Sequence, residues 1–171
     1  MNEKREKLVA FLNSIVNQNI VLEYVEFSSN PQVGGQFTEG EIHREFELKK
    51  LEIGEGKGFL ETPRGKKEVP VFKVSYEGSH FDRLKNADVG YLVKVKFKYS
   101  IIIFLDEKSA FLEIEQEEKK EILRLFAEST GKLMVIPYIR HLIHYLTSSA
   151  GILLPPINPI LLKRKKLVNG E

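Results

Sequence analysis

The stretch from residue 91 to residue 105 constrains the fold most, because apolar side chains occupy every second position along its length. This period of two predicts a β-strand with one buried face. The alternate positions begin with lysines and end with apolar residues, in the order Lys94, Lys96, Lys98, Ser100, Ile102 and Phe104. The second half of the strand is therefore apolar on both faces, and a small sheet with one layer of helices cannot cover both.

Three further strands precede this one in the sequence. Runs of β-branched and aromatic residues between turn signals predict strands over residues 20–27, 41–53 and 69–81. The apolar positions change face near Lys49, which indicates a bulge or a twist there. The closely spaced Gly54, Gly56 and Gly58 predict a hairpin loop, because the strand–loop–helix context of a phosphate-binding loop is missing.

Helices are expected on both sides of the strand region. Residues 3–17 carry apolar side chains at helical spacing and predict an amphipathic helix. Residues 116–128 and 133–148 predict two more, with a break at residues 129–131 that can cap the second. Pro137 would then lie in an opening turn, where proline is tolerated, and Gly151 would end the helix. Strands followed by helices predict an α+β fold with an antiparallel sheet.

The composition of the 171 residues is that of a single soluble domain. The absence of cysteine removes disulfides and thiolate sites and suits the cytoplasm. A net charge of +2 is too small to indicate a nucleic-acid partner, and the basic run from Lys163 to Lys166 is interpreted as a solvated tail. Phe97 and Tyr99 point away from the neighbouring lysines, so a stacking platform for bases is not expected. No stretch fits a signal peptide or a membrane-spanning helix.

No combination of residues indicates an enzyme, a metal or a cofactor. The sequence offers no nucleophile beside a base, and the glutamates between residues 113 and 121 are interpreted as a charged helix surface. His141 and His144 lie three residues apart, but their segment supplies no third metal ligand, so we expect a solvent-facing pair. These observations favour a binding protein that catalyses no reaction.

The segment from Ala127 to Leu162 resembles the C-terminal region of the SecB family of chaperones. The matching residues form a Pro-Tyr-x-Arg step and a Leu-Pro-Pro run, namely Pro137, Tyr138, Arg140, Leu154, Pro155 and Pro156. The order of strands and helices matches the family over residues 18–162, which leaves an additional helix at 1–17 and a basic tail at 163–171. The resemblance implies four antiparallel strands backed by helices, assembled as a homotetramer that is a dimer of dimers.

The resemblance also implies grooves that hold extended polypeptide, with the connection after the first strand covering the groove. The doubly apolar strand end would then be groove floor or subunit interface. Tyr138 and Arg140 are expected to be structural, with the ring in the core and the guanidinium paired with a carboxylate. The candidate groove residues are Phe27, Val33, Phe37, Phe46, Leu48, Tyr99, Ile102, Phe104, Ile139, Ile143, Leu153 and Leu154.

The function that the resemblance implies is that of an ATP-independent holdase, whose clients are unfolded preproteins or an antitoxin. Export members of the family dock on the translocase motor through an acidic face, and Glu23 and Glu26 lie near a position used for that purpose. The basic charge and the N-terminal helix are more similar to solitary SecB-like chaperones that accompany toxin–antitoxin systems. The alternative is a scaffold protein that keeps the fold without the groove.

Overall fold

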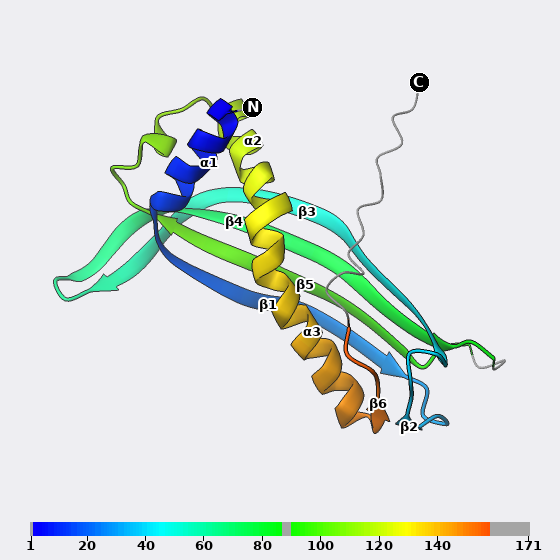
Figure 1. Ribbon diagram of the computed structural model, residues 1–171. Helices are drawn as coiled ribbons and strands as arrows, with labels where there is room; N and C mark the ends of the chain where they lie inside the picture. The colour runs from blue at the N-terminus through cyan, green and yellow to red at the C-terminus, as the bar shows by residue number, and fades with distance from the viewer. Residues whose placement is uncertain (1, 87–89, 158–171) are drawn as a thin grey trace.

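The structure is a computed structural model that describes residues 2–86 and 90–157, and an antiparallel sheet lies at its centre (Figure 1). The strand order is β1-β5-β4-β3, so β1 and β3 form the two edges. The α+β prediction is confirmed. The four strands are β1 (Ile15–Ser29), β3 (Ile42–Thr62), β4 (Gly65–Leu84) and β5 (Val93–Leu105).

Helices cover one face of this sheet, and α3 runs obliquely across it with α1 and α2 at one end (Figure 1). Two short strands, β2 (Gly35–Gln36) and β6 (Ile152–Leu153), form a parallel pair outside the main sheet. Within the described residues, none of the helices is long and apolar enough to cross a membrane. The helical elements are α1 (Asn2–Asn13), the 3₁₀ turn η1 (Ala110–Leu112), α2 (Gln116–Phe126), the π-helical turn η2 (Ala127–Gly131) and α3 (Lys132–Ser149).

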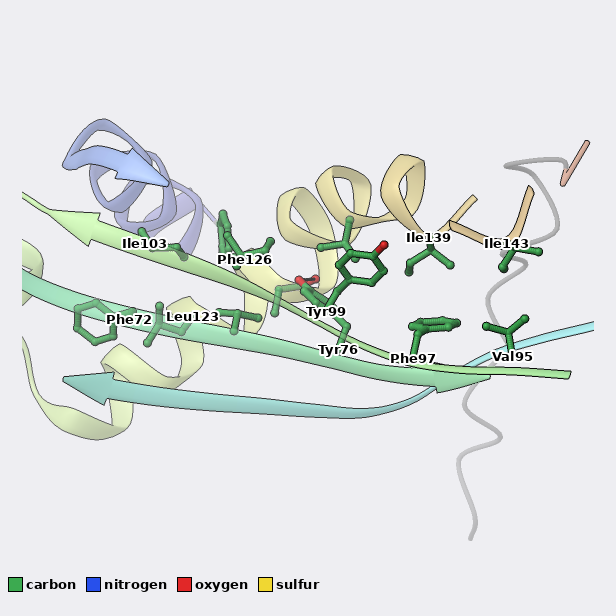
Figure 2. Packing of buried hydrophobic residues seen from close by; sticks show 14 of the residues in the cluster. Phe72, Tyr76, Val95, Phe97, Tyr99, Ile103, Leu123, Phe126, Ile139 and Ile143 are labelled. Carbon is green, nitrogen blue, oxygen red and sulfur yellow. Dashed lines mark hydrogen bonds between the residues drawn. The ribbon is translucent and has the colours of Figure 1, made fainter. Parts of the chain in front are cut away.

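The covered side of the sheet, which we call the helix face, contains the core. Figure 2 shows Ile139 and Ile143 of α3 projecting toward the strand that carries Phe97 and Val95. The predicted alternation in β5 is confirmed, because its helix-face side chains are all 5% exposed or less. These side chains are Val93, Val95, Phe97, Tyr99, Ile101, Ile103 and Leu105. The opposite side, which we call the open face, carries the lysines and then Ser100, Ile102 and Phe104.

The N-terminal helix belongs to the core. Phe11 is fully buried, and its ring lies 4.7 Å from that of Phe111 and 5.5 Å from that of Phe126. Burying such a side chain stabilises the fold by about 1.5–3 kcal/mol. Ion pairs between α1 and α2 surround this contact: Lys4 with Glu121 and Lys7 with Glu118. The helix ends at Asn13, earlier than predicted, because pairing with β5 begins at Ile15.

The hairpin of β3 and β4 is longer than the sequence predicts. Gly54, Gly56 and Gly58 continue β3 in register with β4, so the predicted loop at these glycines is wrong. Pairing with β4 overrides the weak strand propensity of glycine. The turn lies at Thr62–Gly65 instead, where Gly65 has a φ of 111° that glycine adopts at low cost. The predicted bulge near Lys49 is confirmed by a register shift between Leu48 and Lys50.

The helices α2 and α3 are continuous through the π-helical turn η2, so the predicted break and cap at residues 129–131 is wrong. Tyr76 of β4 lies against this turn and donates a hydrogen bond of 2.8 Å to the carbonyl oxygen of Ala127. That oxygen also accepts from the backbone N–H of Lys132, five residues along, as a π turn requires. A Cβ atom at Gly131 would overlap the phenolic oxygen of Tyr76. Tertiary contact therefore shapes this turn.

Because the helix is continuous, Pro137 lies inside α3, and its predicted position in an opening turn is wrong. The end of α3 is as predicted, since Gly151 adopts a φ of 73° just after the last turn. The backbone N–H of Gly151 donates to the carbonyl oxygen of Ser148 at 3.0 Å. The basic run from Lys163 to Lys166 lies outside the described residues.

Candidate functional site

The helix α3 lies over β5 and divides the helix face into two flanks. On the side of β1, which we call the β1 flank, the ring of Tyr138 lies 6.4 Å from that of Tyr99, and Leu22 is the register partner of Tyr99. On the other side, which we call the β3 flank, Arg140 and residues after β6 line a cavity that reaches Arg44 of β3. The two flanks differ in chemistry.

The β1 flank is a row of exposed apolar side chains. Leu22 is 38% exposed, Tyr138 is 50% exposed and Tyr145 is 62% exposed. Tyr145 follows Tyr138 by two helical turns and so returns to the same side of α3. The expectation that Tyr138 packs in the core is wrong. The buried stripe of α3 runs through Val135, Ile139 and Ile143, and Tyr138 lies at the edge of this stripe.

The edge strand β1 carries exposed apolar side chains on both faces of the sheet, because Val21 and Tyr24 are register partners of open-face residues of β5, and Leu22 and Val25 are partners of helix-face residues. Among the described residues its backbone pairs with β5 on one side only, so its other side is an open edge. The opposite edge, β3, contributes only Phe59 to the exposed large apolar side chains of the described residues. Those of β1 are Val16, Val21, Leu22, Tyr24 and Val25. An exposed edge of this kind is a surface on which another strand can pair.

The β3 flank contains a cavity of about 360 Å³, a size typical of ligand sites. Its walls come from one side of α3 and from the segment after β6. The lining residues are Arg44, Pro137, Arg140, His141, Ile143, His144, Thr147, Leu154, Pro155, Pro156 and Ile157. The cavity therefore brings together all of the family-motif residues except Tyr138.

Arg44 holds the outer wall of this cavity in place. Its guanidinium donates to the carbonyl oxygens of Pro155 at 3.1 Å and Pro156 at 3.3 Å, and to a carboxylate oxygen of Asp82 at 3.0 Å. His80 donates to the other carboxylate oxygen of Asp82 at 2.7 Å. Burial by itself raises the pKa of Asp82, but His80 and Arg44 outweigh that effect and bring the pKa below its usual range. The Leu-Pro-Pro run is thus attached to the sheet through one buried ion pair.

The connection after β1 closes one end of the β3 flank. The backbone N–H of Gly35 donates to the carbonyl oxygen of Gly151, and that of Phe37 donates to Leu153, each at 3.0 Å. Val33 and Phe37 are half-buried against the core, whereas Leu153 is 48% exposed. These contacts attach the connection after β1, which the family resemblance places over the groove, to the end of α3.

The open face is covered with ion pairs. Glu23 pairs with Lys73 and Lys98, and Glu26 pairs with Lys96. The hydrogen bond from Lys73 lowers the pKa of Glu23, and the hydrogen bond from Tyr24, followed by that from Lys96, lowers the pKa of Glu26. The two carboxylates that the family resemblance suggested for docking are therefore paired with cations of the same face.

The doubly apolar end of β5 also lies on the open face, away from α3. Phe104 is half-buried because the backbone of β3 packs closely against its ring at Gly58. Only glycine allows this approach, since a Cβ atom at Gly58 would lie 3.1 Å from the ring of Phe104 and 2.6 Å from Val71. The hairpin thus shelters part of the surface that the sequence left uncovered. The most exposed large apolar side chains lie elsewhere, with Leu133 and Tyr145 on α3 and Phe59 near the tip of the hairpin of β3 and β4.

The predicted groove residues fall into three groups. Tyr99, Ile139 and Ile143 are buried in the core, although Ile143 also lines the cavity. Ile102 and Phe104 lie on the open face and do not meet the others. The half-buried or exposed helix-face residues are Phe27, Val33, Phe37, Phe46, Leu48, Leu153 and Leu154.

Sequence reasoning missed Arg44, Thr147 and Ile157 as residues of the cavity. The expectation that His141 and His144 face solvent is confirmed, and both side chains also line the cavity. The four-residue spacing of Arg140 and His144, which places them on one side of a helix, was the available signal. The pairing of Arg44 with Asp82 depends on strand register and had no local signal.

Comparison with known proteins identifies the fold. No protein-family model matches the sequence, and a search of curated proteins finds no match. Among solved structures, the chain is similar to the SecB-like chaperone Rv1957 of Mycobacterium tuberculosis, solved in complex with a ChAD peptide from the HigA1 antitoxin Rv1956. The likeness has a TM-score of 0.58 at 15% identity and covers 93% of this chain and 98% of that one. The chain therefore has a SecB-like fold.

Proposed function

We propose that this SecB-like fold serves as an ATP-independent holdase, which binds extended segments of unfolded polypeptide in the cytoplasm. The observation that carries the proposal is the amount of apolar surface beside α3, where Leu22, Tyr138 and Tyr145 are all more than a third exposed. Covering apolar surface of this kind with a client or another copy of the chain stabilises the complex by about 25 cal/mol per Å². Binding the unfolded form of a client lowers its free concentration and so slows aggregation.

The favoured client class is the tail of an antitoxin rather than a preprotein on its way to export. The similar structure, Rv1957, holds an antitoxin peptide. On the open face, Glu23 and Glu26 pair with lysines, so the two carboxylates near the position that export members use for docking are engaged within this chain, which weighs against docking to the translocase motor. An adjacent toxin–antitoxin gene pair, and a longer antitoxin half-life when this chain is co-expressed, would agree with this assignment.

Aggregation assays test holdase activity directly. We expect equimolar chain to suppress the light scattering of a chemically denatured client diluted into buffer. Tyr145→Gln should weaken suppression by about threefold to tenfold, because a 62% exposed aromatic side chain of the apolar surface beside α3 is lost. Phe59→Gln is the matched control, since Phe59 is 65% exposed but lies on the distant hairpin. Unchanged scattering at equimolar chain would favour a scaffold protein.

Self-association through β1 is a second expectation, in keeping with a dimer of dimers. Light scattering coupled to size exclusion should give a mass above that of one chain. Leu22→Lys should raise the dissociation constant at least about tenfold, because burying an unpaired ammonium costs more than 1.4 kcal/mol. Phe59→Lys, on the opposite edge, should leave the mass unchanged. A monomeric wild type at micromolar concentration would refute this interface.

A further inference from the structure

The cavity on the β3 flank combines apolar walls with cations. Ile143, Leu154 and Ile157 supply apolar surface. Arg44, Arg140, His141 and His144 supply positive charge or N–H donors, and no carboxylate belongs to the lining formed by the described residues. A site of this composition is complementary to an anionic group carried next to an apolar one.

Arg140 is a cation of the cavity that has no partner among the described residues. It is half-buried on the cavity side of α3 and makes no hydrogen bond or ion pair with any residue in 2–86 or 90–157. Arg44 differs, because its guanidinium is already bound to Asp82. A guanidinium presents parallel N–H donors that match the two oxygens of a carboxylate. His144, one turn further along α3, lies on the same side and can add an N–H donor.

We infer that this cavity selects client segments in which an acidic residue lies two positions from a large apolar residue. The inference rests on the proposed function and adds the chemistry of the client. In an extended chain, residues two positions apart point to the same side. The carboxylate then binds Arg140 while the apolar side chain packs on Leu154 and Pro155. Clients without the carboxylate bind more weakly but by the same apolar contacts.

Fluorescence anisotropy with the full chain and labelled peptides tests this selection. The first peptide has the central sequence Leu-Ser-Glu-Ser-Leu. The second replaces the glutamate by glutamine, and the third moves it by one position, to Leu-Glu-Ser-Ser-Leu. We expect the first peptide to bind about tenfold more tightly than the second at low salt, because only the first forms the charge-assisted contact. The third should lose most of the gain, since its carboxylate points to the opposite side.

Variants of the chain locate the effect. Arg140→Gln should remove the tenfold preference, so that the glutamate and glutamine peptides bind this variant with equal affinity. Arg140→Lys, which keeps the charge but not the paired donors, should retain about a threefold preference. Arg124→Gln is the matched control, because Arg124 is an exposed cation of α2 that pairs with Glu128 and lies about 24 Å along the helix axis from residue 140.

Three outcomes would overturn the inference. Equal affinity for the glutamate and glutamine peptides would mean that the cavity has another occupant, such as a second copy or residues 158–171 of this chain. An equal loss in Arg140→Gln and Arg124→Gln would indicate only long-range attraction. Competition by free N-acetylglutamate as effective as that by the peptide would indicate a small-molecule site. If none of the peptides binds and aggregation is not suppressed, the proposed holdase function fails as well.

Discussion

Replacing Arg44 by methionine is expected to lower the free energy of unfolding by about 3–5 kcal/mol, because the change leaves the Asp82 carboxylate buried without its guanidinium partner. The side chain of Asp82 is 0% exposed and that of Arg44 is 11% exposed. The same substitution releases the carbonyl oxygens of Pro155 and Pro156. Urea denaturation at fixed protein concentration measures the loss, since self-association would otherwise contribute.

A double variant separates the charge from the packing. Arg44→Met combined with Asp82→Asn removes both charges, so it should recover at least about 1 kcal/mol relative to the sum of the single losses. Acid supplies a second readout. Because the folded-state pKa of Asp82 is lowered, its ionised form stabilises the fold above about pH 4, and this stabilisation disappears as the pH falls through the folded value. Asp82→Asn should lack that part of the acid sensitivity. Additive losses with unchanged acid sensitivity would contradict the coupling.

The parts of the fold that follow from local pattern could be predicted from the sequence. The alternation along β5 predicted a strand with one fully buried face, and its odd positions are all in the core. The change of face near Lys49 predicted the bulge in β3. Gly151 predicted the end of α3 because helices often end at a residue in the left-handed conformation, which glycine adopts most easily. In each case, the residues that gave the prediction lie within a few positions of the feature that they predicted.

The parts that depend on distant contacts could not be predicted. Gly54, Gly56 and Gly58 favour a loop by propensity, yet β4 holds them in a ladder. The cavity needed the register that brings Arg44 beside Asp82, as well as the path of the segment after β6. Distant contacts also explain why the exposure of the doubly apolar end of β5 was overestimated. The backbone of β3 covers part of it, because Gly58 has no side chain and can approach Phe104 closely.

The π-helical turn is the other feature with a large expected effect. Gly131→Ala should lower the free energy of unfolding by about 2–4 kcal/mol, because the new methyl group would overlap the phenolic oxygen of Tyr76 and lie 3.0 Å from the ring of Phe126. The direction is informative, since the same change at an unhindered helical position stabilises by about 1 kcal/mol. Thermal or urea unfolding of the variant gives the sign.

A cycle with Tyr76→Phe identifies the cause. That single change removes the bond to the carbonyl oxygen of Ala127 and should cost about 1 kcal/mol, because the oxygen keeps its bond from Lys132. In the double variant with Gly131→Ala the overlapping oxygen is absent, so the total loss should fall below the sum of the single losses by at least about 1 kcal/mol. Simple addition would mean that Phe126 or Ile101 limits the space instead. Since the turn directs α3 across the sheet, a variant that folds with this turn altered should also change both flanks of α3, and peptide affinity then reports the shift.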